Sequence, residues 1–489
     1  MKLADVINAI GGEAPDLDQA LAGLDTMSFV IDSREVKTGD VFFALSQPEY
    51  ADNGFNGDFD DSTRYAASAL DAGAAAVVLR RDRFDEYALE LAPHTGRLIY
   101  VDDAIAALQR LARAVYRIWG GKVVAVTGSA GKTTAKELTA HVLAASGRKT
   151  LKNIKNYNNG LGHPLTVLKL AAEPDHDVAV LEMGMSTPLH EIERLCNITP
   201  PDVAVVLNVL PVHLEHLGTI ERIAEAKAEI VEGMKPGGTA VLNADDPRVA
   251  AMRSLSKGDV LTFGIDNDAD VRAVDISVAG FASTRFDVCV DGQRASVEYP
   301  LNGKHNILNA LAAAAVGYSF GMTVSEIANA LSTAEAPPQR GEVLKFADGF
   351  TVINDTYNSN PDALLSMTQT LIAGSPATAR KVVFAGEMLE LGDGSAAIHR
   401  RTGERIGAMG IDVLVGVRGN GRDLAAGAAD AGIADVRFAD DSAMAADIAL
   451  ELLRSGDVVL LKGSRGVRME KIVERLLERF ELEKKAAAK

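Results

Sequence analysis

The residues best suited to chemistry lie in a glycine-rich turn. The apolar run VVAV at 123–126 predicts a buried strand, and TGSAGKTT at 127–134 predicts a tight turn that opens a helix. Backbone N–H groups at a helix N-terminus bind anions, and Lys132 adds a full positive charge. The Thr133 hydroxyl is placed to hold Mg²⁺ beside a bound phosphate. The alternative is an ordinary strand–turn–helix connection with a solvated lysine.

The turn has the short form G-x-x-G-K-T. Val126 stands where the longer pattern G-x-x-x-x-G-K-[ST] has its first glycine. The stretch alone therefore indicates a triphosphate site without indicating which reaction uses it.

An acidic side chain follows a second predicted strand. Residues 177–181, DVAVL, predict a buried strand, and Glu182 stands at its carboxyl end. Proteins that bind nucleotide phosphates reach Mg²⁺ from such a position on a neighbouring strand. A strand-end glutamate can also be a cap or a solvated residue, so the case for Glu182 depends on the glycine turn.

Two further ionisable groups follow a third predicted strand, at 203–208. His213 begins the run HLEH beyond the carboxyl end of that strand, where open α/β sheets bind ligands. This run could bind a metal or form a plain polar loop. Lys227 lies among glutamates in a predicted helix at 219–231, and its spacing alone predicts an exposed, paired lysine.

Length, charge and composition narrow the class of protein. The chain has 489 residues, 47% of them hydrophobic, which predicts about three folded domains. The net charge of −17, with no basic block, argues against a nucleic-acid partner. The two cysteines, Cys196 and Cys289, lack metal-ligand spacing and favour a reducing compartment. Without a signal peptide or a long apolar run, we expect a cytoplasmic protein that does not contact a membrane.

Alternating strand and helix patterns predict an α/β protein. The expected domains are residues 1–101, a small α/β unit, and residues 102–335, with a mostly parallel sheet. Residues 336–489 form the third α/β unit. Within these units the pattern predicts antiparallel strands at 258–300 and a fraying helix end at 481–489.

Taken together, the motifs resemble the Mur ligase family of cell-wall enzymes. The resemblance covers nearly the whole chain, in order: DSR at 32–34, TGSAGKTT at 127–134, NYNNGLGHPLTVL at 156–168, LEMG at 181–184, HLEHLGT at 213–219, AEAKAEI at 224–230, GKHNILNALAA at 303–313, NDTYNSNPDAL at 354–364, GEMLELG at 386–392 and LKGSR at 461–465. The last three motifs separate members that add D-alanyl-D-alanine from siblings that add L-alanine, D-glutamate or a diamino acid.

The resemblance implies an ATP-dependent amide ligase. It implies three domains: a UDP-substrate domain, a central ATP-binding domain and a C-terminal Rossmann-like domain that closes over the site. The implied reaction joins D-alanyl-D-alanine to UDP-N-acetylmuramoyl-tripeptide through an acyl phosphate, with ATP and two Mg²⁺ ions. We expect a monomer.

The family's nucleotide and metal residues carry over to matching positions of this chain. The implied catalytic residues are Lys132, His213 and Lys227, and the implied metal ligands are Thr133, Glu182, His213 and a carbamate on Lys227. The implied ATP-binding residues are Gly128, Ser129, Ala130, Gly131, Lys132, Thr133, Thr134, His305, Asn306, Arg340 and Asp355. For Lys227 the resemblance thus predicts the opposite of what spacing predicts.

The substrate residues carry over in the same way. The implied set is Ser33 and Arg34 for the UDP end, Asn158 and Asn159 for the muramoyl-peptide, and Tyr357, Asn358, Lys462, Ser464 and Arg465 for the dipeptide. The loop at 47–63 is longer and more acidic than the family pattern, which affects the UDP contacts beyond Ser33 and Arg34.

Three alternatives stand beside this interpretation. One is a pseudo-enzyme that uses its interface structurally, against which the intact set Lys132, Thr133, Glu182, His213 and Lys227 argues. A folylpolyglutamate synthase-like ligase shares the glycine loop, although the DSR and NDTYNSNP stretches argue against it. A nucleotide-gated binding protein would hydrolyse ATP without ligation, and only an assay separates it from a ligase.

Overall fold

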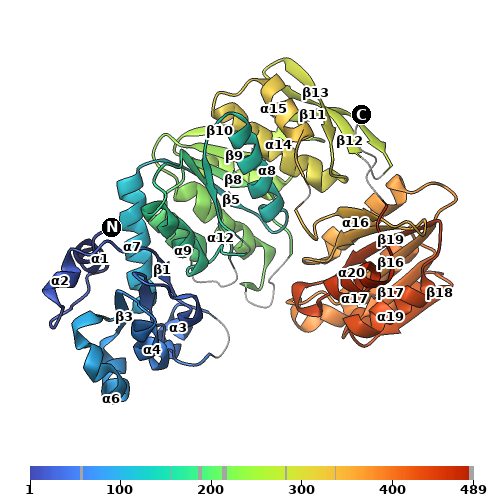
Figure 1. Cartoon of the computed structure of the whole chain (residues 1–489). Coiled ribbons are helices and arrows are strands. Elements are labelled where there is room, and N and C mark those ends of the chain that lie inside the picture. The colour runs from blue at the N-terminus through green and yellow to red at the C-terminus, as the bar shows by residue number, and fades with distance from the viewer. Residues whose placement is uncertain are drawn as a thin grey trace.

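Three sheets follow one another along the chain (Figure 1). The computed structural model describes residues 1–55, 59–154, 156–185, 190–211, 217–280, 283–335 and 337–483. His213 lies outside these residues, as do parts of the loop at 47–63 and of the C-terminal tail.

The N-terminal sheet is small and parallel. Its strands have the order β1-β2-β3-β4: β1 (Phe29–Val30), β2 (Val41–Phe43), β3 (Ala76–Arg80) and β4 (Leu98–Val101). The helices around it are α1 (Leu3–Ile10), α2 (Gln19–Ala22), α3 (Gln47–Asp52), α4 (Ala66–Asp71), α5 (Arg81–Phe84) and α6 (Ala88–Leu91). Helix α3 begins with a capping box of Ser46 and Glu49. The sequence-based expectation of a loop at 47–63 misses this helix-start signal.

The central sheet has the order β13-β12-β11-β10-β9-β8-β5-β7-β6. Its strands are β5 (Lys122–Thr127), β6 (Thr150–Lys152), β7 (Val178–Glu182), β8 (Val203–Val206), β9 (Thr239–Asn243), β10 (Asp259–Gly264), β11 (Val271–Ala279), β12 (Ser283–Val290) and β13 (Gln293–Tyr299). Pairing is parallel from β6 to β11 and antiparallel between β11, β12 and β13. The ends of β5, β7 and β8 therefore meet at one edge.

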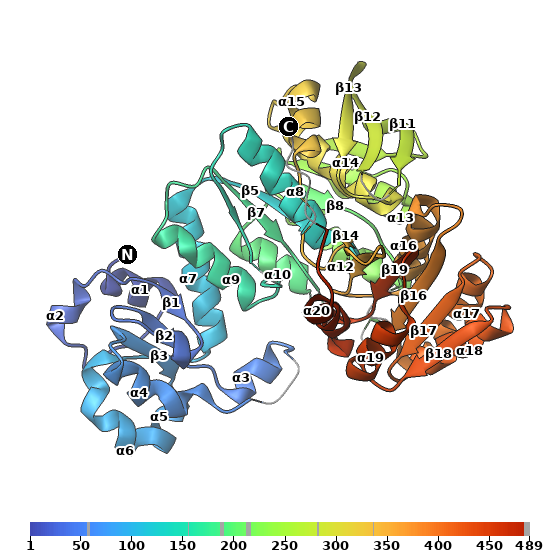
Figure 2. The ribbon, with the colours of Figure 1, turned by 45° about the vertical axis from the view of Figure 1, so that its right-hand side comes forward.

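Helices cover both faces of the central sheet (Figure 2). One core joins β5 to α8 (Lys132–Ala145), α14 (Lys304–Ser319) and α15 (Val324–Ser332). The opposite core contains residues of α7 (Ala104–Trp119), α9 (Gly162–Leu168), α10 (Glu191–Ile198), α12 (Ile220–Glu232) and α13 (Pro247–Ala251). That core continues into the N-terminal sheet through Ile99 and Val101, so α7 packs against both sheets.

The C-terminal sheet has the order β14-β15-β19-β16-β17-β18. Its strands are β14 (Glu342–Lys345), β15 (Thr351–Asp355), β16 (Arg380–Gly386), β17 (Val413–Val417), β18 (Asp435–Ala439) and β19 (Asp457–Lys462). Its helices are α16 (Pro361–Gly374), α17 (Ser395–Gly407), α18 (Gly421–Asp430), α19 (Ser442–Leu452) and α20 (Glu470–Arg479). All neighbouring pairs are parallel except β14 with β15. This is the α/β architecture that the sequence predicts.

Two local predictions are wrong. Strand β10 was expected to be antiparallel, but it pairs in parallel with β9 because the helical connection through α13 returns the chain to the same end of the sheet. Of the helix end expected at 481–489, residues 481–483 are not helical, because α20 ends at Arg479, and residues 484–489 lie outside the described residues. Leu482 then forms a β-bridge to Phe346, and Phe480 packs on Phe346 and Phe350.

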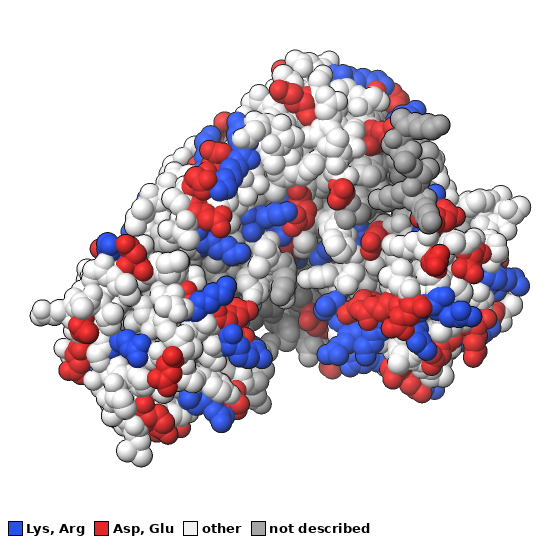
Figure 3. Space-filling view, in the orientation of Figure 1, with Lys and Arg blue, Asp and Glu red and all other residues white. Residues whose placement is uncertain are grey.

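Charges are mixed on the face seen in Figure 3, where lysines and arginines alternate with acids over all three parts. Within the described residues, no helix is long and apolar enough to cross a membrane. On this face, positive charge for a polyphosphate must come from individual side chains, because screening limits a general field to about 8 Å.

Candidate active site

The glycine loop joins β5 to α8 and is braced by the end of β8. The N–H groups of Ser129 and Ala130 donate to Asn208, one to its backbone oxygen at 3.0 Å and one to its side chain at 2.9 Å. Gly131 has φ +84°, and a Cβ there would lie 2.5 Å from Asn309 Oδ1. The turn thus requires glycine, and the N–H groups of the first turn of α8 open toward the loop.

Lys132 lies within this loop. Its Nζ donates to the Gly128 carbonyl oxygen at 2.9 Å. Burial lowers the pKa of Lys132, the Glu182 carboxylate opposes that shift, and the Arg340 charge adds to it. The amine therefore sits at the loop, close to one acid and one further cation.

Thr133 and Glu182 meet as their sequence positions predict. Thr133 Oγ1 donates to Glu182 Oε2 at 2.8 Å, and Asn158 Nδ2 donates to Glu182 Oε1 at 2.7 Å. Glu182 is 3% exposed. A Cβ at Gly184 would press within 3.0 Å of the Asn158 amide, so the glycine makes room for this contact. These hydroxyl and carboxylate oxygens are the hard donors that Mg²⁺ prefers.

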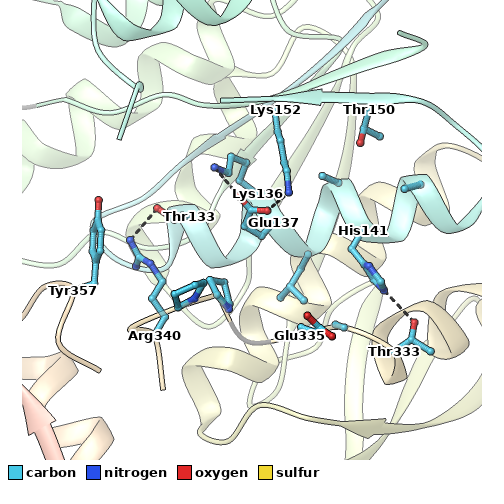
Figure 4. A pocket seen from close by; sticks show the side chains of 16 residues that line it. Thr133, Lys136, Glu137, His141, Thr150, Lys152, Thr333, Glu335, Arg340 and Tyr357 are labelled. Atoms are coloured by element: carbon cyan, nitrogen blue, oxygen red, sulfur yellow. Dashed lines mark hydrogen bonds and ion pairs between the residues drawn. The ribbon is translucent and has the colours of Figure 1, made fainter. Parts of the chain in front are cut away.

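Arg340 brings the C-terminal part of the chain to the same point. Its Nη2 donates to Thr133 Oγ1 at 3.0 Å, and its guanidinium lies 4.0 Å from the centre of the Tyr357 ring (Figure 4). The contact joins the segment before β14 to the first turn of α8. A cavity of about 680 Å³ runs from here along α8, lined by residues such as Lys136, His141 and Pro338.

Lys227 is buried, so the prediction from spacing that this lysine is exposed is wrong. Its side chain is 2% exposed because it shares the inner face of α12 with Ile223 and Ile230. Burial and the nearby Lys132 charge hold the pKa of Lys227 far below its usual value. Within the described residues, no group of three His, Cys, Asp or Glu side chains is arranged to hold a metal ion.

The strand ends of the C-terminal sheet hold a second polar group. Lys462 Nζ contacts Asp355 Oδ2 at 2.5 Å across paired strands β15 and β19, and it donates to the Asn358 carbonyl oxygen at 2.8 Å. Arg465 lies 5.7 Å from the centre of the Tyr357 ring and pairs with Glu470. The predicted dipeptide residues therefore gather at one edge.

Ser464 has a defined local role at this edge. Its Oγ accepts from the Leu389 N–H at 3.0 Å and donates to the Ser359 carbonyl oxygen at 3.4 Å. It thereby ties the GEMLELG loop to the NDTYNSNP segment.

His305 and Asn306 open α14 beside the C-terminal part. His305 Nδ1 lies 3.1 Å from Ser366 Oγ of α16, which makes a contact between the two parts. Burial lowers the pKa of His305 to about 4, with Asp355 opposing the shift and Lys462 adding to it. Asn306 Nδ2 donates to the Asn302 carbonyl oxygen at 2.8 Å.

Two predicted substrate residues, Arg34 and Asn159, have local partners in this structure. Arg34 pairs with Asp32 at 2.6 Å on the N-terminal part, with 87% of its side chain exposed, and Ser33 precedes it in the same short turn. Asn159 Oδ1 accepts from the N–H groups of Leu161 and Gly162 and so caps the turn into α9.

Sequence reasoning missed four polar residues that hold this site together. They are Lys136, Asn153, Asn208 and Asn309. Asn153 directly follows β6, and Asn208 lies two residues beyond the end of β8; at such positions an asparagine can replace a missing backbone partner. Lys136 carried no signal, because a lysine on a helix is ordinarily exposed.

Comparisons with protein-family models and with known sequences identify the same family. The model of the Mur ligase middle domain matches residues 126–317, and that of the Mur ligase glutamate ligase domain matches residues 339–465. The UDP-N-acetylmuramoyl-tripeptide–D-alanyl-D-alanine ligase of Mycobacterium tuberculosis is 36% identical over 98% of each chain.

Two solved structures are similar over nearly the whole chain. MurF from Acinetobacter baumannii superposes with a TM-score of 0.83 at 28% identity, covering 97% of this chain and 98% of that one. MurF ligase from Thermotoga maritima in complex with ADP gives 0.79 at 30% identity, covering 93% and 97%. Sequence and fold agree along the whole length, and the chain belongs to the Mur ligase family.

Proposed function

We propose that the protein is an ATP-dependent ligase that joins D-alanyl-D-alanine to UDP-N-acetylmuramoyl-tripeptide. The observation that carries this proposal is the convergence of Lys132, Thr133, Glu182 and Arg340 at one glycine loop. The full-length likeness to ligases of this specificity selects the substrates.

The glycine loop binds the triphosphate of ATP. Lys132 contacts the β- and γ-phosphates, while the N–H groups from Gly128 to Thr134 surround them. Arg340 approaches from the C-terminal part, where its planar guanidinium suits phosphate oxygens. His305 and Asn306 form part of the adenine site, and Asp355 contributes a further nucleotide contact.

Thr133 and Glu182 fit a first Mg²⁺, since both present oxygen donors at 2.8 Å from each other. His213 and a carbamate on Lys227 are the proposed ligands of a second. When bound, Mg²⁺ neutralises charge on the transferring phosphoryl group.

Lys227 suits carbamate formation because of its burial. Burial and the nearby Lys132 charge lower the pKa of Lys227, and this favours the neutral amine, which has a free electron pair. That pair attacks CO₂, a nitrogen–carbon bond forms, and one proton leaves to solvent. The product is an anion near Lys132, whose positive charge disfavours a protonated Lys227 and attracts the carbamate.

The reaction proceeds through an acyl phosphate. The tripeptide carboxylate attacks the γ-phosphorus of ATP and ADP departs, and the amine of the dipeptide then attacks the acyl carbon and releases phosphate. Ser33 and Arg34 hold the UDP end, and Asn158 and Asn159 lie along the muramoyl-peptide. The proposed dipeptide residues are Tyr357, Asn358, Lys462, Ser464 and Arg465.

We further propose domains at residues 1–101, 102–335 and 336–489, with the third closing over the first two. Closure would shield the acyl phosphate from water. Small-angle scattering with and without an ATP analogue and substrate measures it, and an unchanged radius of gyration would argue against closure.

A product assay tests the function directly. The protein, ATP and D-alanyl-D-alanine are incubated with UDP-muramoyl-tripeptide carrying either lysine or meso-diaminopimelate, and products are weighed by mass spectrometry. We expect one tripeptide form to gain a dipeptide, with phosphate release that requires both substrates. Phosphate release without either substrate would instead favour a nucleotide-gated binding protein.

A further inference from the structure

The side chain of Asn153 takes over strand pairing where β6 ends. The last residue of β6, Lys152, is paired with Val180 of β7. Asn153 follows, and its Oδ1 accepts from the Glu182 N–H at 2.9 Å while its Nδ2 donates to the Glu182 carbonyl oxygen at 3.0 Å. A single amide thus holds both backbone groups of Glu182, as a strand neighbour would.

A buried lysine fixes Asn153 from the other side. Lys136, in the second turn of α8, is 1% exposed, and its Nζ donates to the Asn153 carbonyl oxygen at 2.6 Å. The same ammonium pairs with Glu137 at 3.0 Å, and Glu137 also pairs with Lys152 (Figure 4). Because a buried ammonium is costly unless it is paired, this arrangement is specific rather than incidental.

These contacts form a closed ring of interactions that includes the proposed metal ligands Thr133 and Glu182. Thr133 and Lys136 both belong to α8, and Thr133 bonds to the Glu182 carboxylate. Glu182 bonds through its backbone to Asn153, and Asn153 returns to Lys136. The ring links the helix that starts at the phosphate loop to the end of β7, so it sets the distance between the Thr133 hydroxyl and the Glu182 carboxylate.

We propose that Asn153 and Lys136 are positioning residues that hold Glu182 against Thr133 and thereby couple metal binding to nucleotide binding. Neither residue is assigned a contact with nucleotide or metal. The proposal rests on the proposed ATP and Mg²⁺ site. Groups that orient a metal ligand commonly change metal affinity 10- to 100-fold when altered.

The test measures ADP affinity by calorimetry, once in excess MgCl₂ and once in EDTA. The ratio of the two dissociation constants is the metal coupling, and it needs no turnover. Asn153→Asp keeps the size and the acceptor for the Glu182 N–H, but it loses the donors to the Glu182 and Tyr157 carbonyl oxygens. We expect its coupling to fall about tenfold while ADP affinity in EDTA stays unchanged.

Asp457→Asn is the matched control. Asp457 is 2% exposed and bonds to Arg380 at the opposite end of the C-terminal sheet. The Asp457→Asn variant shows how the isosteric loss of a buried polar contact changes stability alone. Its metal coupling of ADP binding should equal that of the wild type. A merely structural role for Asn153 would lower the melting temperature of both variants without changing the coupling of either.

Lys136→Met provides a second, independent variant. It keeps a long buried side chain and removes the bond to Asn153, so its coupling should fall in the same direction by a smaller factor. If Asn153→Asp does not fold, this variant decides the question. Wild-type coupling in either folded variant would overturn the proposal, whereas a wild-type protein without coupling would overturn the proposed Mg²⁺ site itself.

Discussion

The glycine loop and the strand ends of the C-terminal sheet hold their charged residues in different ways. At the glycine loop, the Glu182 carboxylate at the end of β7 accepts hydrogen bonds from Thr133 of the covering helix α8 and from Asn158. At the C-terminal edge, Asp355 and Lys462 pair on neighbouring strands, and contact with the central part comes through Arg340 and His305.

This difference suggests a division of labour. The groups proposed to activate the carboxylate belong to one sheet and its covering helix, an arrangement that would preorganise charge around the phosphoryl group. The groups proposed for the dipeptide belong to another sheet, and Arg340 and His305 contact across the junction between the two parts. Substitutions in the first group should therefore reduce the rate, whereas substitutions at the junction should reduce capture of the nucleotide.

The largest effect should follow Lys132→Met. The variant keeps the packing of the stem and removes the only charge of the loop itself, so we expect kcat to fall by about 10³-fold. Steady-state phosphate release measures it. Lys149→Met, at an exposed pair with Asp175, should behave as the wild type. Wild-type turnover by Lys132→Met would show that the charge at the glycine loop does not contribute to the chemistry.

Lys227→Ala should have the next largest effect. Loss of the proposed carbamate should lower kcat by about 10²-fold, in line with the loss of one stabilising group. Small carboxylates such as acetate should restore part of the rate, because the cavity left by the side chain admits an anion beside Lys132. Turnover at the wild-type level without added carboxylate would contradict the carbamate.

The strands and the motifs were predictable because their signals are local. Buried strands such as β5, β7 and β8 appear as short apolar runs, and the glycine turn and Glu182 follow directly from them. Their meeting at one sheet edge then follows from parallel pairing, since the carboxyl ends of parallel strands lie together.

The burial of lysines was not predictable, because it depends on distant parts of the chain. Lys136 and Lys227 both lie on helices, and the packing of those helices against the sheet turns both side chains inward. Resemblance to the family identified Lys227, but no local pattern identified Lys136. The direction of β10 was missed for a similar reason, since an alternating strand can pair either way and its connection decides.

Arg340→Lys tests the junction between the two parts. Lysine keeps the charge but loses the planar group that both donates to Thr133 and lies against Tyr357. We expect KM for ATP to rise about tenfold, equivalent to one lost charge-assisted hydrogen bond, with a smaller change in kcat. Arg475→Lys, at an exposed pair with Glu478, serves as the control. A fall in kcat with unchanged KM would instead assign Arg340 to the residues at the glycine loop that act on the rate.

His305 should make the junction sensitive to acid. Burial lowers its pKa from 6.5 to about 4, so the unfolded chain takes up a proton at a higher pH than the folded protein. Its contribution to stability is therefore complete above pH 6.5 and is lost as the pH falls toward 4, in total about 3 kcal/mol. His305→Gln carries no such proton, so its free energy of unfolding should fall less between pH 7 and 5 than that of the wild type. Denaturant titrations at both pH values measure the difference, and His190→Gln, at an exposed histidine, should retain the full wild-type loss. Equal losses in His305→Gln and wild type would mean that the junction is not held by a neutral histidine.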